Sequence, residues 1–369
     1  MVPSGFNLGT STLNGRWARF GPYYAMFPMP WAMDVVSRYS KDGDAVLDPF
    51  AGRGSSVYAA AAQKRIGVGI EINEVGWLFG KVKIHPASED RVLRRLREIE
   101  SLVIPNIRRR ARAMPEFFRM CYCPKVLSFL LCARGNLDWR KSSVDATLMA
   151  IILVYLHGRR GDYLSNQMRD TKAMAPDYSI RWWKKKGLAE PPDIDHLALL
   201  KARIRWRYAK GRPQFDESSM VLGDSTEEVK SLSGNGHRFH LLFTSPPYHK
   251  ITNYHYDQWI RLWMLGHKST AARETGGGPW RRKFESRERY VELLRSVFRD
   301  CARVMADDAT VYVRTDAREF TRDTTLTVLR EAFPGKRITV ENSPLKKPSQ
   351  TALYGDRSKK PGECDIILQ

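Results

Sequence analysis

Short apolar runs alternate with longer amphipathic segments along most of the chain. The runs are bounded by glycine, proline or polar residues, a pattern typical of buried strands. The strands we expect are 45–48, 66–73, a segment ending near 222, 239–244, 309–315, 337–342 and 364–369. The helices we expect are 55–64, 74–84, 253–266, 287–305 and 321–333. Strands that alternate with helices predict an α/β fold with a mostly parallel sheet and helices on both faces.

One long interval breaks this alternation. Between about 85 and 215 no strand pattern stands out, and Arg-rich helical stretches such as RVLRRLREIE and NIRRRARAM take its place. A break of this length indicates an inserted, mainly helical subdomain and not a loop. The expected division is therefore 1–85 and 216–369 for the two parts of one α/β domain, with the insert at 86–215.

The charge balance points to a polyanionic partner. The 369 residues carry a formal net charge of +21, which is extreme for a soluble enzyme. Nucleic acid is the commonest explanation, and a basic surface without a partner is the alternative. Five cysteines without framework spacing predict reduced thiols. The first residues lack a signal-peptide pattern and no apolar run approaches membrane length, so we expect a cytoplasmic protein without a membrane partner.

A glycine-rich turn follows the first expected strand. In VLDPFAGRGSS (46–56), Asp48 ends the strand, and Gly52 and Gly54 allow a tight turn and close approach by a ligand. Glu71 ends the next strand, at the spacing of an acid that accepts hydrogen bonds from two ribose hydroxyls. The turn alone could be structural, but the turn and the acid together favour a cofactor that carries a nucleoside. Asp224, after the third strand, suits an adenine amino group, or alternatively a helix N-cap.

The strand at 239–244 stops on two prolines. In TSPPY, Pro246 and Pro247 cannot donate to a sheet ladder, and they hold the backbone rigid. That rigidity aims the Ser245 hydroxyl, the Pro246 carbonyl and the Tyr248 ring at the sheet edge. Two acceptors and an aromatic ring suit a planar base with an amino group, whereas a plain turn before a helix is the alternative.

These motifs together resemble one family. DPFAGRGSS, GIEIN, VLGDS and TSPPY are similar to the motifs of S-adenosylmethionine-dependent DNA amino-methyltransferases, which modify cytosine N4 or adenine N6. The segment 20–40 resembles the family's N-terminal cofactor segment. The resemblance covers roughly 15–85 and 218–369 and implies a Rossmann-like, seven-stranded methyltransferase sheet whose last strand is antiparallel.

The resemblance also implies roles for single residues. Ser245, Pro246, Pro247 and Tyr248 would form the catalytic loop, Glu71 would hold the ribose, and Asp224 would hold the adenine. The expected contacts to S-adenosylmethionine are Phe27, Pro28, Asp48, Pro49, Phe50, Gly52, Gly54, Ser55, Glu71, Asp224 and Thr244. No residues show metal-ligand spacing, so no metal is expected.

Three features depart from the family pattern. The cofactor motif precedes the catalytic motif, whereas many relatives with an SPPY loop have the reverse order. The insert falls before VLGDS, and Arg53 stands where a small residue is common.

The implied reaction is direct methyl transfer. Ser245 Oγ and the Pro246 carbonyl would accept the two amine hydrogens, so that the nitrogen lone pair points at the sulfonium methyl. The target base would be flipped out of duplex DNA. The hydroxyl of Ser245 favours cytosine N4, with adenine N6 as the alternative.

The insert supplies candidates for DNA contact. DYSIRWWKKKG (177–187) interleaves rings with cations, and Asn166, Gln167 and Arg169 could read base edges. The full set is Asn166, Gln167, Arg169, Arg181, Trp182, Trp183, Lys184, Lys185 and Lys186. A core position is an equal alternative for the tryptophans.

Other functions remain open at this point. An RNA base methyltransferase can use similar loops, and a catalytically silent DNA-binding protein could keep the fold. The expected partner is double-stranded DNA, and a cognate restriction endonuclease that acts separately is a further expected partner of such an enzyme.

Overall fold

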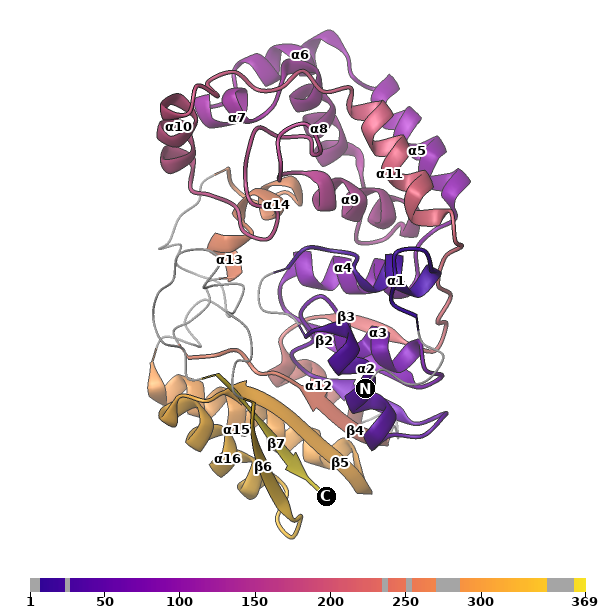
Figure 1. The fold of residues 1–369 in the computed structure, drawn as a ribbon, viewed down its shortest axis with the longest axis vertical. Helices are drawn as coiled ribbons and strands as arrows, with labels where there is room; N and C mark the ends of the chain where they lie inside the picture. Colours follow the sequence, from indigo (N-terminus) through magenta and orange to yellow (C-terminus); the bar gives the residue numbers. More distant parts are fainter. Residues whose placement is uncertain (1–6, 24–26, 234–237, 250–253, 270–285, 344–361) are drawn as a thin grey trace.

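The computed structural model describes residues 7–23, 27–233, 238–249, 254–269, 286–343 and 362–369. Seven strands form one sheet in the order β3-β2-β1-β4-β5-β7-β6 (Figure 1). β7 pairs antiparallel with both neighbours, whereas the other pairings of described strands are parallel. The strands are β1 Ala45–Asp48, β2 Ile66–Glu71, β3 Ser219–Leu222, β4 Phe239–Thr244, β5 Met305–Asp316, β6 Ile338–Ser343 and β7 Glu363–Leu368. The expected methyltransferase sheet is confirmed, including its antiparallel last strand.

Helices cover both faces of the sheet. The first face holds the N-terminal helices α1 Leu13–Ala18, α2 Met29–Tyr39, α3 Ser55–Ala61 and α4 Glu74–Ile84. The second holds α12 Ser225–Ser233, α15 Arg287–Val304 and α16 Glu319–Ala332. The alternation of β4 builds this arrangement, because Leu241 and Phe243 join the core on the first face while Leu242 joins the core on the second.

The helices α5–α11 lie between β2 and β3 in the chain and form the upper part of Figure 1. Their bounds are α5 Glu89–Ser101, α6 Pro105–Arg112, α7 Glu116–Cys121, α8 Pro124–Asn136, α9 Ser143–Tyr155, α10 Pro176–Lys185 and α11 His196–Tyr208. α9 is apolar on all sides and buried along its length, as a central helix must be. The core of the first sheet face continues into these helices without a break.

The segment expected to be one helix at 253–266 contains two short helices, α13 Tyr254–Asp257 and α14 Trp259–Met264. α14 packs among the helices of the insert and not on the sheet. The Trp259 ring lies 5.0 Å from Phe117, and the fully buried Arg261 donates to the Leu153 carbonyl at 3.0 Å. The chain that leaves the SPPY loop is therefore anchored on the insert.

The helices of the described part of the chain lack the combination of length and apolarity that a membrane span requires.

Candidate active site

The predicted cofactor residues gather where the parallel strands end. Asp48 pairs in register with Gly69, and Glu71 pairs with Leu222, so the turns after β1, β2 and β3 open on one edge of the sheet. Ligands of open α/β sheets bind at this edge. β4 ends beside β1, which brings the SPPY loop to the same edge.

Asp48 is the internal anchor of the edge. Its side chain is 2% exposed, and it accepts hydrogen bonds from the Phe50 amide at 3.0 Å, the Thr244 hydroxyl at 2.6 Å and the Ser56 hydroxyl. Burial raises the pKa of Asp48 to about 6, against the lowering effect of these three donors. Asp48 therefore joins β1, β4 and α3, and it shapes the turn from within.

The two glycines of the turn have the conformation that their sequence position predicts. Gly52 and Gly54 have φ values of 54° and 69°, in the left-handed region that a β-carbon disfavours. A Cβ built on Gly52 would meet only Tyr23 Cε1, at 3.8 Å, so the backbone there is open to a ligand. The neighbouring Ser55 is 3% exposed, and its hydroxyl has no hydrogen-bond partner among the described residues. A buried hydroxyl without a hydrogen-bond partner at the first turn of α3 suits the carboxylate of a bound cofactor that contains an amino-acid group.

Arg53, the departure from the family pattern, has a structural explanation. Its guanidinium is buried and donates to the carbonyls of Phe20 and Gly21 at 3.2 and 2.8 Å. The Arg53 carbonyl in turn accepts from the fully buried Lys83 at 2.8 Å. Arg53 thus ties the glycine turn to the N-terminal segment and does not face the cofactor edge.

Glu71 holds the turn from the other side. Its Oε2 accepts from the Gly52 amide and its Oε1 from the Asn73 amide, each at 2.7 Å. Burial raises the pKa of Glu71 to about 7, and the two amides oppose that rise. The carboxylate is half-buried, so it is fixed in place and still reaches the edge where a ribose would lie.

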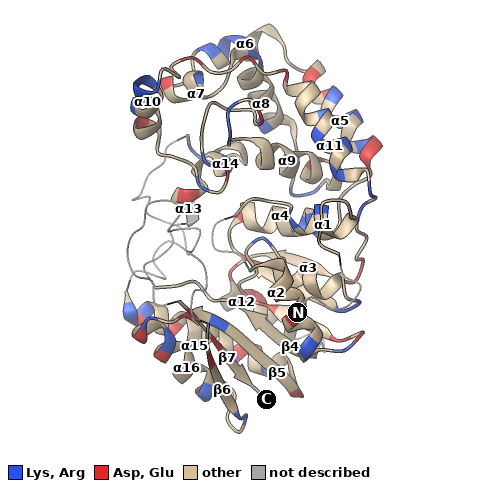
Figure 2. Ribbon diagram, viewed as in Figure 1, with Lys and Arg blue, Asp and Glu red and all other residues tan. Residues whose placement is uncertain are grey.

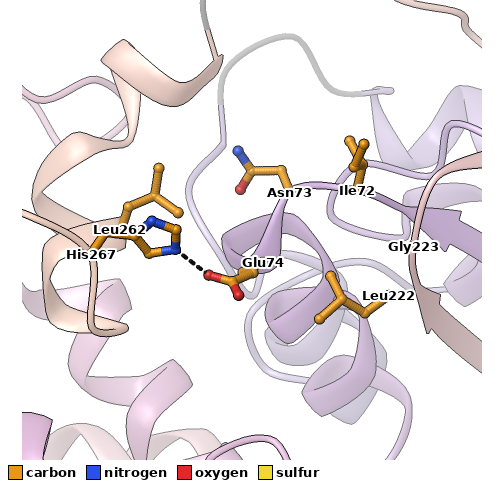
Figure 3. Close-up of a pocket in the computed structure, with 7 residues that line it drawn as sticks. All are labelled: Ile72, Asn73, Glu74, Leu222, Gly223, Leu262 and His267. Atoms are coloured by element: carbon orange, nitrogen blue, oxygen red, sulfur yellow. Dashed lines mark hydrogen bonds and ion pairs between the residues drawn. The ribbon is translucent and has the colours of Figure 1, made fainter. Parts of the chain in front are cut away.

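A cavity of about 170 Å³ lies between the segments that follow β2 and β3 (Figure 3). Its walls come from the segments after β2 and β3 and from α14 with the turn that follows it. The lining residues are Ile72, Asn73, Glu74, Leu222, Gly223, Leu262 and His267. Pockets that hold a whole drug-sized ligand measure roughly 300–1,000 Å³, so this cavity suits one end of the cofactor, the adenine.

The wall on the α14 side is closed by a hydrogen bond between Glu74 and His267. Glu74 accepts from His267 Nε2 at 2.5 Å and also contacts Arg140 of the insert. Burial acts to raise the pKa of Glu74, but the His267 and Arg140 contacts together outweigh it and hold that pKa below its ordinary value. Sequence reasoning did not single out these residues, because they meet only in three dimensions.

Asp224 caps a helix. Its Oδ1 accepts from the Thr226 amide at 3.1 Å and from the Thr226 hydroxyl at 2.8 Å, at the start of α12. The alternative predicted for Asp224, a helix N-cap, is therefore present, and adenine contact stays a prediction. The adjacent Ser225 hydroxyl donates to the Pro49 carbonyl, which ties the turn after β3 to the turn after β1.

The segment before α2 contacts β4, the strand that precedes the SPPY loop, through aromatic stacking. The Phe27 ring is parallel to that of Phe243, with centroids 4.9 Å apart and planes at 2°. Pro28 follows as the exposed N-cap of α2. Residues 24–26 of this segment lie outside the described residues. The ring of Phe50 packs toward Phe298 on the second face. Phe50 therefore contributes its backbone, and not its ring, at the glycine turn.

The SPPY loop leaves β4 directly at this edge. Thr244 is fully buried, Pro246 and Pro247 are buried, and Ser245 and Tyr248 are partly exposed. Ser245 Oγ donates to the Tyr248 hydroxyl at 3.3 Å, and that hydroxyl donates to Glu363 Oε1 at 3.3 Å. The loop therefore presents its two polar side chains to the edge and buries its prolines.

Glu363 and Arg314 are two residues that sequence reasoning missed. Arg314, on β5, forms two hydrogen bonds of 2.6 Å with Asp365 and an ion pair of 3.3 Å with Glu363. Its guanidinium also lies 3.6 Å from the centroid of the Trp31 ring. The available signal was an Arg and an Asp inside otherwise apolar strands, since such residues are buried only when paired.

The structure contradicts the prediction that Asn166 contacts DNA. Asn166 is fully buried, donates to the Met120 and Leu188 carbonyls at 3.0 and 2.7 Å, and accepts from Arg160 at 2.7 Å. Its hydrogen-bonding groups hold the loop together, so Asn166 cannot read a base edge. Gln167 also accepts within the protein, from the Arg160 amide at 3.0 Å, whereas Arg169 is exposed.

Trp183 is a core residue. It is fully buried, its ring lies 5.6 Å from Phe117 in a stacked arrangement, and its indole donates to the Gln167 carbonyl at 2.8 Å. The prediction that Trp183 contacts DNA is therefore wrong, and the core alternative holds. Trp182 is half-buried and packs against the same core.

The solvent face of α10 is basic and carries one exposed aromatic ring. Arg181, Lys185 and Lys186 are exposed, whereas Lys184 is paired with Glu116 at 2.8 Å. Tyr178, which sequence reasoning did not single out, is 52% exposed on this helix. Figure 2 shows further cations along α5 and α6. The exposed arginines there are Arg91, Arg94, Arg97, Arg108, Arg109, Arg110 and Arg112.

One family model matches the N-terminal part of the chain. Residues 8–75 match a family model described as DNA methylase, N6_N4_Mtase. A search of curated proteins finds no match.

Several solved structures resemble the chain weakly. A TehB-like SAM-dependent methyltransferase from Corynebacterium glutamicum has 8% identity, covers 92% of this chain and 86% of its own, and gives a TM-score of 0.34. The rRNA methyltransferase aviRa from Streptomyces viridochromogenes has 10% identity, covers 100% of this chain and 94% of its own, and gives a TM-score of 0.36. A SAM-dependent methyltransferase from Agrobacterium tumefaciens has 9% identity, covers 92% of this chain and 60% of its own, and gives a TM-score of 0.38. At such scores the strand order of this chain, and not its neighbours, identifies the fold.

The sheet and the matched family model together support a methyltransferase whose cofactor is S-adenosylmethionine. The residues fit that cofactor. The orphaned Ser55 hydroxyl and the open backbone of Gly52 suit its methionine end, Glu71 suits the ribose, and the cavity suits the adenine.

Proposed function

We propose that this protein transfers the methyl group of S-adenosylmethionine to the exocyclic N4 amine of a flipped-out cytosine in double-stranded DNA. The observation that carries the proposal is the adjacency of the two motifs. Thr244, which directly precedes Ser245, donates to Asp48, which directly precedes the glycine turn. The loop that would accept the amine and the turn that would bind the cofactor therefore share one edge of the sheet. The family match over residues 8–75 supports a DNA amine as the acceptor.

The loop supplies two acceptors for one amine. Ser245 Oγ would accept one amine hydrogen and the Pro246 carbonyl the other, while the buried ring of Pro247 holds the backbone in place. The lone pair of the nitrogen then points at the methyl group that the cofactor would supply. The N–C bond would form as the sulfonium S–C bond breaks, and the methylated nitrogen would release one proton to water. Positioning provides most of the rate acceleration, because the donor is already activated. The Tyr248 ring would stack on the extruded base.

The choice of cytosine rests on the neutral first residue of the loop. A carboxylate at the position of Ser245 would bring a negative charge toward the acceptor N3 of cytosine, whereas a neutral hydroxyl avoids that repulsion. Adenine N6 methylation is the alternative product.

The insert would bring the duplex to this edge. The exposed face of α10, with Arg181, Lys185, Lys186 and Tyr178, combines cations for phosphates with a ring that can stack. The exposed arginines of α5 and α6 extend the positive surface.

The test is identification of the product. Purified protein is incubated with labelled S-adenosylmethionine and either duplex DNA of mixed sequence or total RNA, and the digested nucleosides are analysed by mass spectrometry. We expect N4-methylcytosine from the DNA. N6-methyladenine would replace the cytosine assignment, and label only in RNA would reject DNA as the substrate.

A matched pair of serine variants shows that the loop is responsible. Ser245→Ala should lower turnover by about 10²–10³-fold, the usual effect of removing one polarising group. Ser231→Ala, which changes an exposed serine on α12, should leave turnover unchanged. Equal activity of the two variants would contradict the assigned role of the loop.

A further inference from the structure

The SPPY loop is connected to a carboxylate on the last strand. Ser245 Oγ, the Tyr248 hydroxyl and Glu363 Oε1 form a continuous chain with two links of 3.3 Å. Glu363 begins β7, which pairs antiparallel with β5, and its register partner is Asp316. Sheet pairing therefore brings a distant acid to the catalytic loop.

The direction of these two hydrogen bonds follows from the carboxylate of Glu363, at which the series ends. An ionised carboxylate can only accept, so the Tyr248 hydroxyl must donate to Glu363. The phenol oxygen then accepts from Ser245, and the single proton of Ser245 is committed to Tyr248. The lone pairs of Ser245 Oγ are left to accept from a substrate amine.

We propose that Glu363 is a positioning residue of the methyl transfer, which acts through Tyr248 to fix Ser245 as a hydrogen-bond acceptor for the target amine. This inference rests on the proposed amino-methyl transfer. It gives the Tyr248 hydroxyl a function beyond the stacking of the ring. It also explains how a neutral serine, which could otherwise donate, is held in the accepting state.

The surroundings of Glu363 keep the carboxylate in place without making it essential to the fold. Its side chain is 41% exposed, and Arg314 contacts it at 3.3 Å. Arg314 keeps its two bonds of 2.6 Å to the buried Asp365 if Glu363 is changed. The charged or titratable groups that face Glu363 are Arg314, Tyr248, Asp365 and Asp316.

Protonation of Glu363 would remove the fixed direction. A protonated carboxyl can donate to Tyr248, and Ser245 could then turn its proton toward the amine. Burial raises the pKa of Glu363, and the Arg314 and Tyr248 contacts oppose that rise. Turnover should therefore fall as the pH is lowered through the pKa of Glu363.

The decisive variant is Tyr248→Phe, which keeps the ring and removes the hydroxyl. Tyr248→Phe and Glu363→Gln should each lower kcat about tenfold, with unchanged KM for DNA and unchanged cofactor affinity. The double variant should be no slower than either single variant, because both break one chain. Glu363→Gln should also abolish the fall of kcat at low pH that the wild type shows.

Controls separate this inference from the proposed function. Glu341→Gln changes an exposed carboxylate on the neighbouring strand β6 and should match the wild type in kcat and melting temperature. Three results would overturn this inference but leave the proposed function standing. These are a Tyr248→Phe variant with wild-type kcat, a double variant whose loss is the product of the two single losses, and a fall of kcat at low pH that persists in Glu363→Gln. A wild-type protein that methylates no amine in DNA would instead refute the proposed function.

Discussion

The Thr244 hydroxyl donates a hydrogen bond of 2.6 Å to Asp48 Oδ1, and this bond joins the last residue of β4 to the last residue of β1. Thr244 precedes the SPPY loop and Asp48 precedes the glycine turn. Both side chains are buried, so the bond is shielded from water. Removal of either partner should therefore affect the cofactor turn and the loop together.

Thr244→Val tests this connection. The change leaves the volume of the side chain nearly constant but removes one donor to a buried carboxylate. We expect the free energy of unfolding to fall by about 1–3 kcal/mol and the affinity for S-adenosylmethionine to weaken. Denaturant titration and calorimetry measure the two effects.

A matched control exists in Thr325, which is fully buried and donates to the Thr321 carbonyl at 2.7 Å within α16. Thr325→Val should lower stability while cofactor affinity stays at the wild-type value. If both variants bind the cofactor as the wild type does, Thr244 has no role at the site.

The pKa of Glu71 predicts how cofactor affinity depends on pH. Burial raises this pKa from its ordinary value of 4.5 to about 7, and ribose hydroxyls favour the ionised form. Affinity should therefore increase as pH rises from about 6 to about 8, by at most about tenfold per unit below the pKa. Glu71→Gln should bind more weakly and show a flat profile.

The same shift affects the stability of the ligand-free protein. Between about pH 4.5 and about pH 7 the folded chain binds more protons at Glu71 than the unfolded chain, because the folded pKa is the higher one. The contribution of Glu71 to the free energy of unfolding should therefore fall as pH rises through this window. Glu71→Gln should remove that part of the slope in denaturant titrations at several pH values, and an unchanged slope would contradict the assignment.

The solvent face of α10 should contribute to DNA affinity through phosphates. Replacement of Arg181, Lys185 and Lys186 by Ala should make the plot of log affinity against log salt shallower, by about one unit for each phosphate that the variant no longer binds. The control changes Arg330, Lys336 and Arg337, three cations near the end of α16 and the start of β6, which lie at the opposite end of the molecule (Figure 1). Equal slopes for the two triple variants would remove α10 from the interface.

Two aromatic residues of one helix should behave differently. Trp183→Ala should lower the free energy of unfolding by about 3–5 kcal/mol, because it empties a packed core site. Tyr178→Ala should leave the melting temperature unchanged and weaken DNA binding, since the ring is exposed. Melting curves together with fluorescence anisotropy distinguish the two outcomes, and the reverse pattern would contradict the structure.

Local patterns in the sequence are sufficient to predict the elements of the catalytic sheet and the positions of its motifs. Glycines that need positive φ, prolines that end a strand and acids that follow apolar runs are local signals, since their effects act within a few residues. These signals alone assign Asp48, Glu71, Ser245 and Tyr248 to one edge of the sheet. The antiparallel last strand followed from the family resemblance.

Tertiary packing, in contrast, selects which polar and aromatic residues face solvent. Trp182 and Trp183 are adjacent in sequence, and the packing of Phe117 selects Trp183 for the core. Asn166 lies in a polar loop, yet carbonyls of two distant segments satisfy it. The chain from Ser245 through Tyr248 to Glu363 likewise depends on the pairing of β5 with β7. Such contacts join residues far apart in the chain, and their energies depend on packing and desolvation that no local pattern encodes.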